Sequence, residues 1–213
     1  KAIAKTCSNG SSEMETNLSL GIVNMLYNIQ LMELVGEDGV AAYGVIMYSA
    51  TIFIYIMIGY AVGLTPVVGY HYGANNLEEL HSLLIKSASI MFMMGAFLTG
   101  MAEILSEYVA RIFVGFDQQL MIMTTRAFKI YSIAYLILPL NILASAYFTG
   151  LNNGLISALI SFSRTFVLQI ASILLLPIII GLDGIWFATV AAESLSLIVS
   201  ISCFAANRNR YGY

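Results

Sequence analysis

The hydrophobic residues of the chain form long uncharged runs, separated by short clusters of charged or turn-forming residues. A helix needs about 20 apolar residues to cross a bilayer, and Gly-Asn or Gly-Asp clusters are typical of turns. GLNNG and GLDG therefore divide the C-terminal apolar region into separate crossings. The pattern predicts six membrane helices: Leu18–Leu34, Val40–Tyr70, Leu83–Leu105, Ile130–Phe148, Leu155–Ile180 and Ile185–Phe204.

Composition supports lipid as the solvent of these helices. Hydrophobic residues make up 59% of the chain and charged residues only 10%, whereas soluble domains carry roughly 25% charged residues. The mean hydropathy is +0.85. A core of 213 residues is too small to hide this much apolar surface from water. The predicted fold class is an all-α membrane protein, a six-helix transmembrane bundle.

The ends of the chain are polar and are predicted to lie outside the bilayer. The opening KAIAKTCSNGSSEMET lacks the apolar core of a signal peptide, which predicts a cytosolic linker (1–16) from a longer protein. It is followed by the membrane lobe (17–207) and a cytosolic tail (208–213). Six crossings put both termini on one side. The cytosolic assignment follows from the basic residues on the side of the termini, which are Lys1, Lys5, Lys86, Arg208 and Arg210. The opposite side has Arg111, Arg126 and Lys129.

Between the second and third helices, Asn75 or Asn76 is predicted to cap a helix with Glu78 and Glu79 in its first turn. Two interpretations are open for the residues that follow. They form either a separate amphipathic segment at the interface or a helix that continues into the third span, and the periodicity favours the continuous helix.

One carboxylate, Glu193, lies inside the sixth predicted helix. Steps of three or four residues place Thr189, Ser196, Ser200 and Cys203 on its face. A charge facing lipid is very costly, so Glu193 is predicted to face the protein interior. Two roles remain open: a structural carboxylate that ties helices together, and a proton or cation site.

Arg164, nine residues into the fifth helix, is the other costly residue. Counted from the GLDG turn, Arg164 is roughly 25 Å deep and Glu193 roughly 14 Å. An offset of roughly 11 Å is near the limit for two extended side chains, so a direct bridge is not the expected arrangement. Without a nearby cation, burial favours a neutral carboxyl, and Glu193 is expected to be mostly protonated.

Polar or small residues also form stripes on other helices, and Asn or Ser can bond across such close contacts. The stripes comprise Gly44, Tyr48, Thr51, Tyr55 and Gly59; Asn17, Gly21, Asn24 and Asn28; and Asn141 with Ser145 near Pro139. They predict a polar-lined interior. The candidates for a substrate or ion pathway are Asn24, Asn28, Tyr48, Thr51, Tyr55, Asn141, Arg164 and Glu193.

Catalytic and metal-site signatures are missing from the sequence. It has no G-x-x-x-x-G-K-[ST] motif, His71 and His81 match no H-E-x-x-H site, and no Ser/His/acid arrangement stands out. Cys7 and Cys203 belong to no metal or disulfide motif. We expect no enzymatic activity, no cofactor and no metal centre.

An ordered series of segments resembles the multidrug and toxic compound extrusion (MATE) transporters. It runs through AAYGVIMY, PVVGYHYGANN, FKIYSIAY, LNILASAYFTGLNNG, Arg164 and GLDGIWFATVAAE, and extends over Asn17–Asn207. The resemblance implies one lobe, the C-terminal one, of a twelve-helix inner-membrane antiporter, with an N-terminal six-helix lobe as partner. Such transporters exchange inward sodium ions or protons for outward drugs, often organic cations, by alternating access.

The sequence departs from one branch of this family, which places cation-binding acids in the first and fourth helices of this lobe. Here Glu13 and Glu15 precede the membrane, Glu33 lies at its outer end, and the predicted fourth helix has no acid. A coupling acid in the N-terminal lobe is therefore expected. The alternatives are a lobe of a lipid-linked oligosaccharide flippase, which would need more cationic residues than Arg164, and a membrane scaffold that does not transport.

Overall fold

The protein, seen in a computed structural model, is described along its backbone for residues 2–212, with side chains for 18–208 and 210–212. These residues form six long helical rods, two of which contain a short irregular stretch. The elements are α1 (Ala2–Leu34), α2 (Glu37–Gly73), α3 (Leu77–Val114), α4 (Gln118–Ser132), η1 (Ile133–Leu136), α5 (Leu138–Gly150), α6 (Gly154–Phe162), η2 (Ser163–Leu168), α7 (Gln169–Ile180) and α8 (Leu182–Tyr211).

The rods follow the six predicted spans in order. Five are long and apolar enough to cross a membrane, a search confined to the described residues: Glu37–Gly73, Leu77–Val114, Gln118–Gly150, Gly154–Ile180 and Leu182–Arg208. The rods are longer than predicted, so Arg111, Arg126 and Lys129 lie within helices rather than in loops. The backbone of the predicted linker continues α1 from Ala2, and the side chains of 1–16 lie outside the described residues.

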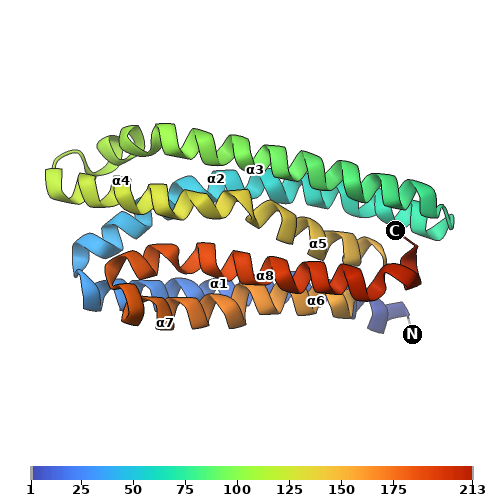
Figure 1. Ribbon diagram of the computed structural model, residues 1–213. Coiled ribbons are helices and arrows are strands. Elements are labelled where there is room, and N and C mark those ends of the chain that lie inside the picture. Colours follow the sequence, from blue (N-terminus) through green and yellow to red (C-terminus); the bar gives the residue numbers. More distant parts are fainter. Residues whose placement is uncertain (1, 213) are drawn as a thin grey trace.

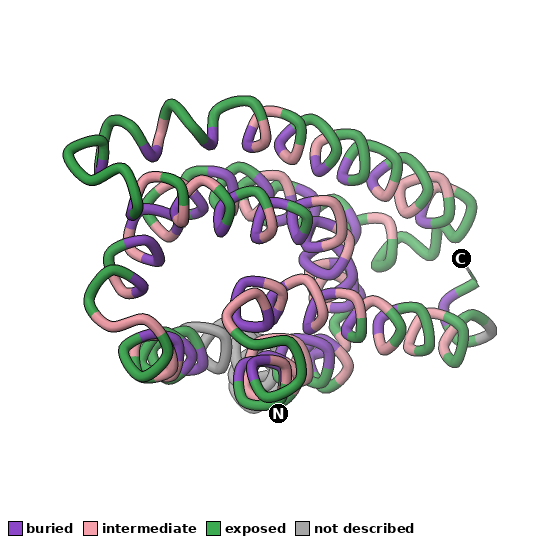
Figure 2. Tube along the Cα trace, turned by 60° about the vertical axis from the view of Figure 1, so that its left-hand side comes forward, coloured by how far each residue is buried: buried purple, intermediate pink, exposed green. Residues whose placement is uncertain are grey.

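The rods pack in two layers (Figure 1). One layer holds α2, α3 and the α4–α5 rod, and the other holds α1, the α6–α7 rod and α8. The beginning of α1 and the end of α8 lie together, and we call this the terminal end. The opposite, distal end carries the α1–α2, α3–α4 and α7–α8 turns. Buried positions face between the rods while much of the outer surface is exposed (Figure 2).

Inside the layer of α2, α3 and the α4–α5 rod, the helix backbones approach closely at two glycines. A Cβ on Gly95 of α3 would lie 2.5 Å from the backbone oxygen of Tyr135 in η1, and one on Gly150 would lie 2.9 Å from the backbone oxygen of Thr65. Neither backbone oxygen can move aside easily, so larger residues would push α3 from η1 and α5 from α2. These glycines set the spacing of the helices around η1 and α5.

The connection between α2 and α3 settles two of the predictions. Asn76 is the cap, because its side chain accepts a hydrogen bond from the Glu79 backbone N–H at 3.2 Å. Asn75 instead adopts a left-handed conformation with φ of 55°. From Leu77 the helix runs unbroken to Val114, so the continuous-helix interpretation is confirmed.

The fourth rod is broken in a way that the sequence pattern did not predict. Between α4 and α5 the chain forms the 3₁₀ turn η1, and Pro139 occupies the first turn of α5. Proline has no N–H to donate and fits the start of a helix better than its interior. The break turns α5 relative to α4 (Figure 1). Asn141 of α5 then lies opposite α8, where it donates to the Glu193 backbone oxygen.

Candidate functional site

The polar face of α8 points into the bundle, as predicted. Thr189, Glu193, Ser196 and Ser200 are 5%, 4%, 0% and 2% exposed, respectively. The Glu193 carboxylate is therefore enclosed by protein rather than facing lipid. Its confirmed orientation follows from the high cost of a charged group in the hydrocarbon region.

Both oxygens of the Glu193 carboxylate have partners from other helices. Asn141 donates through Nδ2 to Glu193 Oε2 at 2.7 Å and to the Glu193 backbone oxygen at 2.9 Å. Arg164 donates through a terminal guanidinium nitrogen to Oε1 at 3.3 Å. Ser200 donates to Asn141 Oδ1 at 3.0 Å, which fixes the orientation of the amide. We call Glu193, Asn141, Arg164 and Ser200 the carboxylate centre.

The contact between Arg164 and Glu193 corrects the sequence prediction. The depth count assumed a regular α-helix, but Arg164 lies in η2, a π-helical stretch over Ser163–Leu168. A π-helix has i→i+5 hydrogen bonds, which change the register and direction of side chains, and such bulges are frequent at functional sites. Arg164 and Glu193 expose only 12% and 5% of their side chains. The argument for a neutral Glu193 assumed a distant cation, and that assumption is wrong.

A second buried group lies next to the carboxylate centre, and sequence reasoning did not find it. Tyr27 of α1 and Thr189 of α8 hydrogen-bond through their hydroxyls at 2.8 Å. Gln169 of α7 donates to both hydroxyls, at 3.1 and 2.9 Å. The available signal was that Gln169 is the one glutamine in the predicted fifth span. This group joins α1, α7 and α8, the helices of one layer, to one another.

Hydroxyl side chains connect α5 to α6 on the terminal side of the carboxylate centre. Ser145 bonds to Ser157 and Ser161 at 2.9 and 2.8 Å, and Thr149 bonds to Ser157 at 2.7 Å. Ser145 lies one turn from Asn141, as the sequence spacing indicated. The hydroxyls satisfy one another between the two helices, which is the usual role of serine and threonine at membrane helix contacts.

The stripe on α2 is not in the interior of this bundle, so that prediction is wrong for the described chain. Tyr48 and Tyr55 are 74% and 66% exposed, and Thr51 is exposed as well. The buried face of α2 instead carries residues such as Ile46 and Met57. Tyrosine, threonine and glycine bear no charge, so exposure of this stripe carries little energetic cost and periodicity alone could not decide its direction.

The two asparagines of α1 lie near the edge of the polar interior. Asn24 is exposed on the whole but accepts a 2.7 Å hydrogen bond from the Tyr43 hydroxyl. The ring of Tyr43 stacks on Tyr27, with 4.6 Å between ring centroids. Asn28 donates to the backbone oxygen of Asn24 at 2.8 Å. The structure thus brings Asn141, Arg164 and Glu193 together, while Asn24 connects only to the tyrosine pair and Asn28 only to its own helix.

Two buried donors near Glu193 have spare hydrogen-bonding capacity. Arg164 Nε and Ser196 Oγ have no partner among the described residues. Buried polar atoms in proteins nearly always form hydrogen bonds. Among the described residues, no group of three or more His, Cys, Asp or Glu side chains is arranged to hold a metal ion.

Comparison with known proteins decides the family. A sequence model of the MatE family matches residues 14–175, most of the chain. The chain belongs to the MATE family. MATE proteins are multi-pass membrane transporters rather than enzymes, in agreement with the membrane helices described above. No curated protein matches the sequence.

Solved MATE structures share this fold. The outward-facing conformation of a multidrug resistance MATE family transporter of the MOP superfamily is 24% identical with a TM-score of 0.89, over 100% of this chain and 47% of that chain. The inward-facing conformation of such a transporter is 24% identical with a TM-score of 0.83, over 95% of this chain and 46% of that chain. A crystal structure of MATE in complex with MaL6 is 22% identical with a TM-score of 0.86, over 99% of this chain and 47% of that chain. The chain thus spans about half the length of the MATE structures it matches, and its bundle corresponds to one six-helix lobe.

Proposed function

We propose that this chain is the C-terminal lobe of an efflux antiporter that exchanges sodium ions or protons for organic cations by alternating access. The observation that carries the proposal is the MatE match over residues 14–175, together with a fold shared with multidrug MATE structures in inward-facing and outward-facing conformations. The partner of the lobe is an N-terminal six-helix lobe, and the transporter lies in the inner membrane with both ends of this lobe in the cytosol.

In this proposal the exposed face of α2 lines the substrate path between the two lobes. Tyr48 and Tyr55 present large aromatic surfaces, and Thr51 lies between them. Aromatic faces attract organic cations through their quadrupole. The α2 stripe does not line the interior of this lobe, but in this proposal it lines the space between the two lobes.

The carboxylate centre is proposed to be structural first. Glu193 is fully engaged by Asn141 and Arg164, so it holds α5, η2 and α8 together rather than waiting for an ion. The coupling acid is then located in the partner lobe. The same engagement of Arg164 argues against the oligosaccharide flippase alternative, because Arg164, the one deep cation among the described residues, is already paired with Glu193 and is not free to bind a pyrophosphate.

The proposal is tested by reconstitution in vesicles that contain a fluorescent organic cation. The 213-residue chain is compared with the same chain joined to an N-terminal MATE lobe, under sodium, proton or no gradient. We expect gradient-driven movement of the dye only when both lobes are present. Equal, robust transport by the single chain would contradict the two-lobe mechanism, and gradient-independent movement in the two-lobe protein would contradict antiport.

A further inference from the structure

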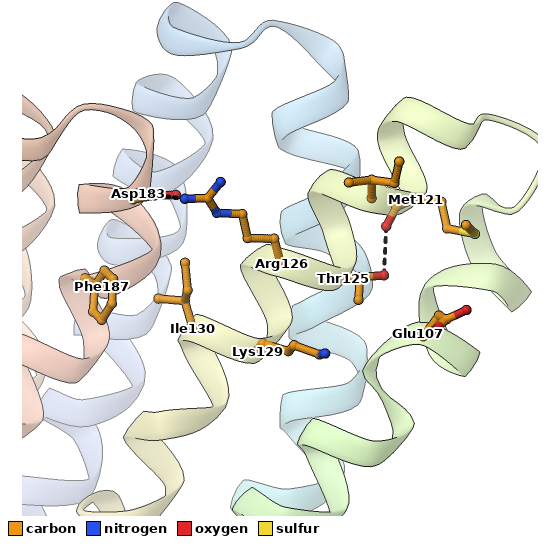
Figure 3. A pocket seen from close by; sticks show the side chains of 9 residues that line it. Glu107, Met121, Thr125, Arg126, Lys129, Ile130, Asp183 and Phe187 are labelled. Carbon is orange, nitrogen blue, oxygen red and sulfur yellow. Dashed lines mark hydrogen bonds and ion pairs between the residues drawn. The ribbon is translucent and has the colours of Figure 1, made fainter.

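The outer surface of the bundle has a pocket at the distal end, away from the carboxylate centre. The pocket has a volume of about 650 Å³ and lies over α4 between α3 and α8 (Figure 3). On the α8 side it is lined by Ile130, Phe187 and an ion pair between Arg126 and Asp183. On the α3 side Lys129 extends toward Glu107. The pocket thus combines apolar surface with charged groups, and nothing in the proposed transport mechanism uses it.

The lining of the pocket holds two acidic and two basic side chains, and of these four only Lys129 has no ion-pair partner among the described residues. Arg126 is paired with Asp183, and Glu107 is paired with Arg111 at 3.0 Å. Lys129 is exposed and forms no ion pair with any of the described side chains. Arg126 also remains 68% exposed at its side chain, and a guanidinium has more N–H groups than one carboxylate uses. The Arg126 and Lys129 side chains extend to opposite sides of α4 (Figure 3), so an anion over the α3 side contacts Lys129, while Arg126 keeps its pair with Asp183.

The position of the pocket along the helix matches the level of lipid headgroups. The α4–α5 rod has 33 residues, which makes it roughly 50 Å long, against a hydrocarbon layer of roughly 30 Å. A centred rod extends roughly 10 Å beyond the hydrocarbon at each end, and Lys129 lies about 16 Å from its start. The Lys129 backbone is then just inside the hydrocarbon edge, and its long side chain reaches the headgroup layer.

We propose that this pocket binds an anionic phospholipid. The phosphodiester contacts the Lys129 ammonium, and an acyl chain lies along Ile130 and Phe187 in the direction of the membrane centre. The pairing removes the cost of an uncompensated ammonium at the hydrocarbon boundary. Small-molecule pockets have volumes of roughly 300–1,000 Å³. At about 650 Å³, this pocket has room for a headgroup and the upper part of one acyl chain.

The test uses native mass spectrometry of the 213-residue chain released from detergent with phosphatidylglycerol, or with phosphatidylcholine of the same acyl chains. Wild type should retain phosphatidylglycerol several-fold more than phosphatidylcholine. Lys129→Ala should lower phosphatidylglycerol retention at least fivefold, and Lys129→Arg should restore it. Lys86→Ala is the matched control, because Lys86 is also an exposed lysine, on α3 outside the pocket, and it should retain the lipid as wild type does.

Three results would overturn the lipid site: equal retention of the two lipids, equal loss in Lys86→Ala and Lys129→Ala, or full displacement of the lipid by millimolar inorganic phosphate. The last would identify a site for free phosphate instead. A second measurement does not depend on the variants. A photoreactive phosphatidylglycerol added to membranes that contain the wild-type protein should cross-link to α4 or the start of α8, and cross-links confined to other helices would contradict the proposal. Neither measurement depends on transport.

Discussion

Neutralising Glu193 should destabilise the lobe through the arginine that it leaves behind. In Glu193→Gln the amide oxygen can still accept the hydrogen bond from Asn141, so packing and shape are nearly kept. The Arg164 guanidinium, however, stays charged and 12% exposed without its counter-charge. Removing one partner of a buried ion pair costs about 3–5 kcal/mol. We expect about 3 kcal/mol, the lower end, because Asn141 retains a partner.

The double variant Glu193→Gln with Arg164→Gln separates the charge effect from packing. Replacing both charges of a buried pair with neutral groups is often close to neutral in stability, and a hydrogen bond between membrane helices contributes about 0.6 kcal/mol on average. The double variant should therefore unfold within about 1 kcal/mol of wild type, which gives a coupling energy of about 2 kcal/mol or more between the two positions.

The assay is reversible unfolding in SDS, followed by the fluorescence of Trp186. It is the single tryptophan of the chain and is 2% exposed, and it lies on α8 two turns from Glu193, so its signal reports on the helix of interest. Asn141→Ala serves as a comparison that removes hydrogen bonds to Glu193 without changing a charge. If Glu193→Gln unfolds within about 1 kcal/mol of wild type, or if the two single effects simply add, the ion pair does not stabilise the centre as argued.

Transport in the two-lobe protein gives the functional side of the same cycle. With Glu193 structural, the stable double variant keeps gradient-driven transport per folded molecule. Loss of transport in the double variant despite normal stability would make Glu193 a coupling residue.

The orientation in the membrane, the α2 stripe and the helix spacing can each be tested separately. Cysteines introduced at 1–5 and at 208–213 should react with an impermeant thiol reagent only from the cytosolic side, and labelling from outside the cell would reverse the orientation. Tyr48→Ala and Tyr55→Ala should leave stability within about 0.5 kcal/mol but weaken binding of an organic cation several-fold, measured by dye fluorescence in the two-lobe protein. Gly95→Ala should cost about 2 kcal/mol in SDS unfolding because the methyl group meets a backbone oxygen, whereas Gly100→Ala, with nothing within 4 Å, should cost little; equal effects would refute the close-packing argument.

The sequence predicted the helices well because run length and turn residues report directly on membrane crossing. Periodicity correctly predicted that Glu193 faces the interior of the bundle. The same argument was wrong about the direction in which the α2 stripe faces. The difference is energetic, since a carboxylate in lipid is too costly to tolerate. Thr51, in contrast, satisfies its hydroxyl within its own helix by donating to the Met47 backbone oxygen at 2.7 Å. Polar stripes of neutral residues can therefore face either way.

The partners of Glu193 were harder to predict than its orientation. Asn141 follows the turn at η1, and Arg164 lies within the π-helical η2, so neither partner of Glu193 continues a regular helix from the start of its rod. Neither irregularity leaves a clear mark in hydrophobic periodicity. The Pro139 signal was present but is equally compatible with a smooth helix start. Cross-helix contacts depend on rotation and depth together, and the depth could be counted from the sequence only for regular, parallel helices.

Asn141 also has a mechanical consequence. Its amide group clasps both the main chain and the side chain of the same residue on α8, so α5 and α8 cannot slide past each other by even one residue, roughly 1.5 Å, without breaking both hydrogen bonds. Immediately before α5, η1 is a short 3₁₀ helix, which is wound more tightly than an α-helix and has poorer hydrogen-bond geometry. Bending within this lobe should therefore concentrate at η1, with α4 moving as a lever while α5, η2 and α8 travel as one block.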